Sequence, residues 1–233
     1  MPPSPRIARL GRNSERNPGV ASPDDIFKRS PELLTPVALA YERRLKRFGD
    51  TPKGVFWKNA EWQRRRYEIL VRIFDDAANE GGVTIHDFGC GYGALFDFLV
   101  DHPAMRSSSY IGTDMCKGMV ETASERIDDP RALFVRHLTA TETADFTFVS
   151  GTFNMHMGAD TEEWATYVRE SLLRLWNRTR RGLAFNLLSI SASERYDGLY
   201  YATPENYLEF AREHMDPSAE LIVEPPLPDF TIF

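Results

Sequence analysis

The sequence has little cysteine and no long hydrophobic run, and each absence excludes a class of protein. Among 233 residues the cysteines are Cys90 and Cys116, too few for a disulfide framework or a cysteine-rich zinc site. No HExxH or CxxC motif compensates, so no metal is implied. No apolar stretch approaches the roughly 20 residues that span a bilayer, and the first residues lack the apolar segment of a secretory signal. We therefore expect a cytoplasmic protein without membrane association.

An excess of positive charge is also lacking, since the net charge is −6. This balance argues against a general polyanion-binding protein. The charge is uneven, however: residues 1–80 hold 16 Lys and Arg against 11 Asp and Glu, whereas residues 81–233 hold 12 against 23. The basic part could contact nucleic acid, but its arginines fall at helical spacing, which a solvated helix face explains. We do not expect nucleic acid as a partner.

Apolar residues make up 42% of the chain, as in globular proteins. Residues 1–30 hold five prolines and no sustained apolar period, which predicts a mobile arm. From Pro31, placed in a first turn, apolar residues recur at helical spacing until Gly49. A second helix follows the loop at 50–59 and ends before Gly81. Residues 31–80 are therefore interpreted as a helical cap.

From Val83 onward, short strand-like segments alternate with helical segments of about ten residues. This alternation predicts βαβ units and a mostly parallel, doubly wound α/β sheet of seven strands within residues 81–233. Only three residues separate the last two strand segments, LIVEP and DFTIF. A parallel crossover needs a longer connection, so we expect an antiparallel C-terminal hairpin.

A glycine-rich loop, Gly89-Cys90-Gly91-Tyr92-Gly93, joins the first predicted strand to the first helix of this sheet. Glycines let the backbone turn sharply and approach a ligand, which meets the N–H groups of the helix start. The second strand ends at Asp114, near the distance at which an acid reaches a ribose in nucleoside-binding folds. Together these features predict a nucleoside-containing ligand.

The ligand has two candidates at this point. Gly89, Gly91 and Ala94 satisfy the GxGxxG/A pattern of a nicotinamide-dependent oxidoreductase. Asp87, two residues before the first glycine, would repel a pyrophosphate but suits an ammonium group. S-adenosylmethionine carries such a group, and Asp87 favours it.

The pattern Asp87-x-Gly89-x-Gly91-x-Gly93, Asp114 after the second strand and the terminal hairpin resemble the class I S-adenosylmethionine-dependent methyltransferases, with a Rossmann-like fold. The resemblance implies that Asp87 lies by the methionyl amino group, that Asp114 holds the ribose and that Met115 packs on the adenine. It also makes the loop with Trp57 similar to an N-terminal lid. The residues implied in cofactor binding are Trp57, Asp87, Gly89, Cys90, Gly91, Gly93, Asp114, Met115, Ser150 and Gly151.

The sequence departs from the family pattern after two strands. After the third, Arg136 to Ala140 offer no acid for the adenine amino group. The fourth ends in Ser150-Gly151-Thr152-Phe153-Asn154 and not in the Asn/Asp-Pro-Pro-Tyr of enzymes that methylate amino groups of nucleic acids and glutamine. This difference argues against methylation of DNA bases.

Methyl transfer from a sulfonium is an in-line displacement that requires alignment and few catalytic groups. His156, just past the fourth strand, is the candidate general base, with packing in its turn as the alternative. His86 faces away from Asp87 and is expected to be structural. His137 could line the adenine side, and Tyr196, Tyr200 and Tyr201 could contact an acceptor or form an aromatic patch.

The sequence therefore predicts a methyltransferase that acts on an oxygen or nitrogen of a small molecule. An RNA or protein methyltransferase that uses the basic N-terminal region is the first alternative. A non-catalytic S-adenosylmethionine-binding protein and an NAD-dependent oxidoreductase are the others. The oligomeric state is left open.

Overall fold

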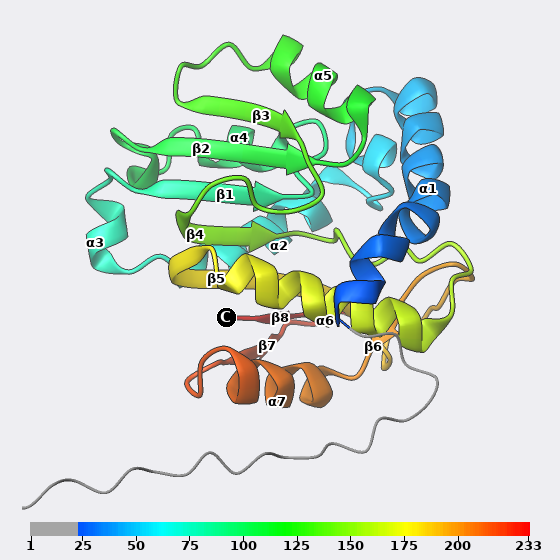
Figure 1. Cartoon of the computed structure of the whole chain (residues 1–233). Helices are drawn as coiled ribbons and strands as arrows, with labels where there is room; N and C mark the ends of the chain where they lie inside the picture. The colour runs from blue at the N-terminus through cyan, green and yellow to red at the C-terminus, as the bar shows by residue number, and fades with distance from the viewer. Residues whose placement is uncertain (1–22) are drawn as a thin grey trace, which may run out of the picture.

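The computed structural model describes residues 23–233, and side chains from residue 26. Its centre is one twisted sheet in the order β3-β2-β1-β4-β5-β8-β7, with the short β6 paired to the end of β5 (Figure 1). The first five strands of this order are parallel, and β8 is antiparallel to β5 and β7. The strands are β1 Thr84–Phe88, β2 Ser109–Asp114, β3 Ala132–Arg136, β4 Ala144–Val149, β5 Thr179–Ser189, β6 Tyr201–Ala202, β7 Leu221–Val223 and β8 Asp229–Ile232.

Helices cover both faces of the sheet, and in Figure 1 α6 crosses in front of it while α4 lies behind. The helices are α1 Pro23–Phe48, α2 Ala60–Leu70, α3 Asp76–Asn79, α4 Ala94–Leu99, α5 Lys117–Arg126, α6 Thr161–Trp176 and α7 Pro204–His214, with 3-10 turns η1 Pro52–Val55, η2 Val71–Ile73 and η3 Pro103–Met105. None of the helices described from Pro23 onward has the length and hydrophobicity to cross a bilayer.

The two larger apolar cores result from the alternation of side chains along the strands. In β5, Leu183, Phe185 and Leu187 pack in one core with α1, α6 and α7, whereas Ala184 faces the other core with α2 and α4. The doubly wound sheet and its antiparallel C-terminal hairpin confirm the predicted fold. The sequence did not reveal β6, because two residues are too few to show a period.

The first helix begins earlier than its sequence pattern predicted. It starts at Pro23, so residues 23–30 are helical and only residues 1–22 of the expected arm lie outside the described part of the chain. Pro31 sits inside the helix, where it cannot donate to the Phe27 carbonyl. The Ser30 hydroxyl donates to that carbonyl instead, at 2.8 Å. Ile26 is fully buried, and the burial of this side chain stabilises the additional helical turns.

The second helix is shorter than expected. It begins after Asn59, whose side chain accepts a hydrogen bond from the Trp62 N–H, and ends at Leu70. The 3-10 turn η2 and the short α3 follow before Gly81. The order of the sheet reverses between β1 and β4, so the carboxyl ends of β1, β2 and β4 meet at a switch point where ligands bind in such sheets.

Candidate active site

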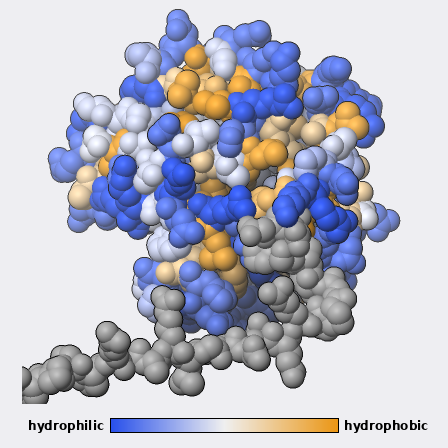
Figure 2. Space-filling model, viewed as in Figure 1, coloured by the Kyte–Doolittle hydropathy of each residue, from blue (hydrophilic) through white to orange (hydrophobic). Residues whose placement is uncertain are grey.

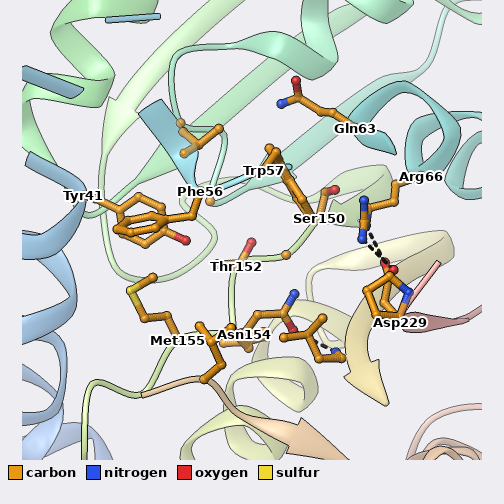
Figure 3. Close-up of a pocket in the computed structure, with 18 of the residues that line it drawn as sticks. Tyr41, Phe56, Trp57, Gln63, Arg66, Ser150, Thr152, Asn154, Met155 and Asp229 are labelled. Carbon is orange, nitrogen blue, oxygen red and sulfur yellow. Dashed lines mark hydrogen bonds and ion pairs between the residues drawn. The ribbon is translucent and has the colours of Figure 1, made fainter. Parts of the chain in front are cut away.

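A cavity of about 1110 Å³ opens at this switch point (Figure 3). The structure brings together at its wall nine of the ten residues that the sequence implied for the cofactor. These are Trp57, Asp87, Gly89, Cys90, Gly91, Asp114, Met115, Ser150 and Gly151. Gly93 does not line the cavity. It is the N-cap residue of α4 with φ 87°, and a Cβ there would lie 2.5 Å from Ile127, so packing and backbone conformation require glycine.

Asp87 is a buried carboxylate at the end of β1, with 2% of its surface exposed. Burial raises the pKa of Asp87 to about 7, although a 2.5 Å hydrogen bond from the Tyr110 hydroxyl opposes the shift and nearby Asp114 adds to it. No cation pairs with this carboxylate among the described residues. A ligand ammonium group placed here would stabilise the ionised form of Asp87.

Asp114 ends β2 and is held by the backbone. Its two carboxylate oxygens accept hydrogen bonds from the N–H groups of Gly91, at 2.9 Å, and Cys116, at 2.8 Å. Burial raises the pKa of Asp114, while these N–H groups act in the opposite direction. The contacts fix the carboxylate against the glycine loop.

A segment of the N-terminal helical region covers the cavity. Val55 of η1 lies against the glycine loop, 3.3 Å from the position a Cβ would take on Gly91. The Arg44 side chain of α1 holds this segment, because its Nε donates to the Lys53 carbonyl at 3.0 Å and its guanidinium lies 4.5 Å from the centre of the Phe56 ring. Helix α1 therefore holds in place the segment that leads to Trp57, which was predicted to contact the site.

Trp57 lies between the end of β4 and a buried ion pair (Figure 3). The Arg66 guanidinium stands 4.3 Å from the centre of the Trp57 ring. Arg66 donates through Nε and Nη2 to both carboxylate oxygens of Asp229, at 2.6 and 2.7 Å. This bidentate pair joins α2 to the first residue of β8 and forms part of the cavity wall.

The contact between Trp57 and the end of β4 gives a testable prediction. A Cβ on Gly151 would lie 2.5 Å from the Trp57 ring, so Gly151→Ala should push the indole away and change its fluorescence. Gly158→Ala is the matched control, because both glycines have positive φ but nothing lies within 4 Å of a Cβ at Gly158. Each variant should lose about 1 kcal/mol from the backbone. An identical emission spectrum in both variants would contradict this position of Trp57.

Only some of the histidines and tyrosines that the sequence singled out line the cavity. His156 is half-buried, does not line the cavity and has no partner for Nδ1 among the described residues, so the structure does not place it as a base. His86 is structural as expected, because it is buried and shares a 2.9 Å hydrogen bond with the Thr113 hydroxyl. His137, Tyr196 and Tyr201 line the cavity. Tyr200 instead shares a hydrogen bond with the Tyr207 hydroxyl in the core.

Tyr41, Arg66 and Asp229 are among the residues of the cavity wall that sequence reasoning missed. Arg66 belongs to the run Arg64-Arg65-Arg66, which predicts a solvated face, yet only Arg66 is buried. The signal that could have distinguished it is its helical spacing from Trp62, Ile69 and Leu70, which places it on the apolar side of α2.

Comparisons with known proteins concern the family and the fold of the chain. No protein-family model matches the chain. The chain is 34% identical over 152 residues to "Putative methyltransferase Rv1506c" of Mycobacterium tuberculosis, a match that covers 64% of this chain and 90% of that protein.

Solved methyltransferase structures share the fold at low identity. The SAH-bound magnesium protoporphyrin IX methyltransferase of Synechocystis PCC 6803 has a TM-score of 0.59 at 13% identity, covering 89% of this chain and 98% of its own. An S-adenosylmethionine-dependent methyltransferase of Mesorhizobium loti has a TM-score of 0.52 at 13% identity, covering 71% and 94%. With the 34% identity to the mycobacterial protein, the chain belongs to the class I S-adenosylmethionine-dependent methyltransferase family.

Proposed function

We propose that this enzyme transfers the methyl group of S-adenosylmethionine to an oxygen or nitrogen of a small molecule. The observation that carries the proposal is one continuous cavity of about 1110 Å³. Its volume exceeds the roughly 300–1,000 Å³ of a pocket for one small ligand, so cofactor and acceptor can share it. Residues implied in cofactor binding line part of it, and apolar and polar side chains from α1, α2 and the loops after β4 and β5 line much of the rest.

The residues present fit the cofactor. Ionised Asp87 would pair with its ammonium group, Asp114 would accept from the ribose hydroxyls, and Met115 would pack on the adenine. Burial of Asp87 without a protein cation supports the first assignment. When bound, the cofactor supplies an electrophilic methyl group on a sulfonium sulfur. The covering segment with Val55 and Trp57 would keep water from the reacting atoms.

Alignment is the main task of this site, as for in-line displacement in general. His156 lies outside the cavity wall, so we assign no base to it. Family membership sets aside the oxidoreductase and non-catalytic alternatives. RNA or protein as the acceptor is an alternative outcome of the test described below. A cytoplasmic location stays a prediction.

The test is transfer of label from S-adenosylmethionine labelled in its methyl group. The enzyme is incubated with cell extract divided into small-molecule, RNA and protein fractions, at low and high salt. We expect label in small molecules at both salt concentrations. Label in RNA that disappears at high salt would contradict the proposal, because phosphate contacts release counterions. Asp114→Asn is the control, since it should reduce labelling in whichever fraction is the substrate.

A further inference from the structure

The exposed apolar side chains of the described chain are concentrated at the mouth of the cavity. Eight large hydrophobic residues are exposed in residues 26–233, and five of them line this cavity: Phe56, Leu138, Met157, Tyr196 and Val223. They come from segments far apart in sequence, so local composition does not explain the clustering. Apolar patches interrupt an otherwise largely hydrophilic face of the molecule in Figure 2. An apolar rim on a ligand cavity indicates a ligand with apolar surface.

Two residues of this rim are held in an unfavourable backbone conformation. Phe56 has φ 63° and Met157 has φ 51°, and Ser107 is the only other residue of this kind besides glycine in the described chain. Bulky side chains rarely adopt this region, because the Cβ approaches the following carbonyl. Both residues nevertheless present their side chains at the cavity, each with 39% of its surface exposed. Such strain is typical of functional sites.

The lining of the cavity combines polar and apolar groups. Near the strand ends, the buried Ser150 hydroxyl lines the cavity and has no hydrogen-bond partner among the described residues. Met155, which is buried, and Met157, which is exposed on the rim, add flexible thioethers that adapt to apolar ligands of varied shape. A ligand that satisfies both parts has a polar end and an apolar body.

We propose that the methyl acceptor is an amphipathic small molecule, with its reacting polar group inside and its apolar part on the rim of Phe56, Met157, Tyr196 and Val223. This inference rests on the proposed function, because it names the class of acceptor for the same cavity. The continuity of the rim with the cavity is the reason to assign a small molecule to it and not a second copy of the chain.

The experiment measures binding of a homologous series of 4-alkylphenols, from methyl to octyl, by displacement of 1-anilinonaphthalene-8-sulfonate from the full chain with S-adenosylhomocysteine present. Each added methylene should tighten binding about fourfold until the chain leaves the rim, the value for methylene burial. Affinity that does not depend on chain length would overturn the inference. Calorimetry with S-adenosylhomocysteine alone tests the proposed function separately.

Variants of rim residues test whether the alkyl chain binds at the rim. Phe56→Asn and Met157→Asn suit the positive φ, so they should still fold, and they remove the apolar side chain, so they should weaken octylphenol binding at least tenfold. Leu39→Ser and Leu133→Thr are controls, because both residues are exposed but lie outside the cavity. Equal losses in the controls would overturn the inference. So would rim-dependent binding to phospholipid vesicles, or rim-dependent dimerisation, without alkylphenol binding.

Discussion

Arg66→Met should unfold at a markedly lower temperature than the parent chain. The substitution leaves the Asp229 carboxylate buried without its cation, since the side chains of Arg66 and Asp229 are 4% and 3% exposed. Breaking a buried pair in this way costs about 3–5 kcal/mol. At about 2–4 °C per kcal/mol for a chain of this size, the melting temperature should fall by roughly 10 °C. Thermal unfolding followed by circular dichroism measures the change.

Two further variants distinguish the buried charge from a general effect of removing arginine. Arg65→Met is the matched control on the next residue, because Arg65 is 45% exposed and its contact with Glu224 is 3.4 Å long. Exposed pairs contribute about 0–1 kcal/mol, so this variant should unfold close to the parent. The double variant Arg66→Met with Asp229→Leu removes both charges and should recover much of the loss. A double variant no more stable than Arg66→Met would show that the ion pair is not the cause.

Cofactor affinity should rise with pH through the titration of Asp87. Its pKa is raised to about 7 by burial, and only the ionised carboxylate attracts the ammonium group of the ligand. The ionised fraction increases between pH 6 and pH 7.5, so S-adenosylhomocysteine should bind roughly eightfold more tightly at the higher pH. Isothermal titration calorimetry across this range measures the effect.

Variants of Asp87 and of its hydrogen-bond partner Tyr110 test whether the pH dependence arises from Asp87. Asp87→Asn should bind weakly and lose the pH dependence, because an amide carries no charge at either pH. Tyr110→Phe removes the 2.5 Å hydrogen bond that favours ionisation, so the transition should move to higher pH. If the transition persists in Asp87→Asn, another group is responsible.

The same pKa affects stability in the opposite direction when no ligand is present. Folding raises the pKa of Asp87 from 3.8 to about 7, so between these values the folded chain keeps a proton that the unfolded chain has lost. The contribution of Asp87 to the free energy of unfolding therefore falls as pH rises from about 4 to 7. A bound ammonium group offsets this cost, so the stabilisation by ligand should increase over the same interval.

The sequence by itself determined the sheet and the strand ends that meet at the site. Period-two and helical patterns are local signals, and so is the short link before β8, because the length of a connection dictates whether neighbouring strands can run parallel. The glycines and acidic residues at the ends of β1 and β2 are local sequence signals as well. For this reason Asp87, Gly91 and Asp114 could be named before their positions were known, and they line one cavity.

Only the tertiary structure decided which residues complete that cavity. In the sequence, Arg66 resembles its exposed neighbours. Folding brings it against Asp229, 163 residues away, in the wall of the cavity. His156 lies next to the cavity-lining Met155 and Met157 but does not line the cavity itself. Helix α1 begins at Pro23 despite Pro31, because the Ser30 hydroxyl and the burial of Ile26 compensate. Such outcomes depend on contacts between distant segments, and a local pattern carries no information about a partner that folding alone brings near.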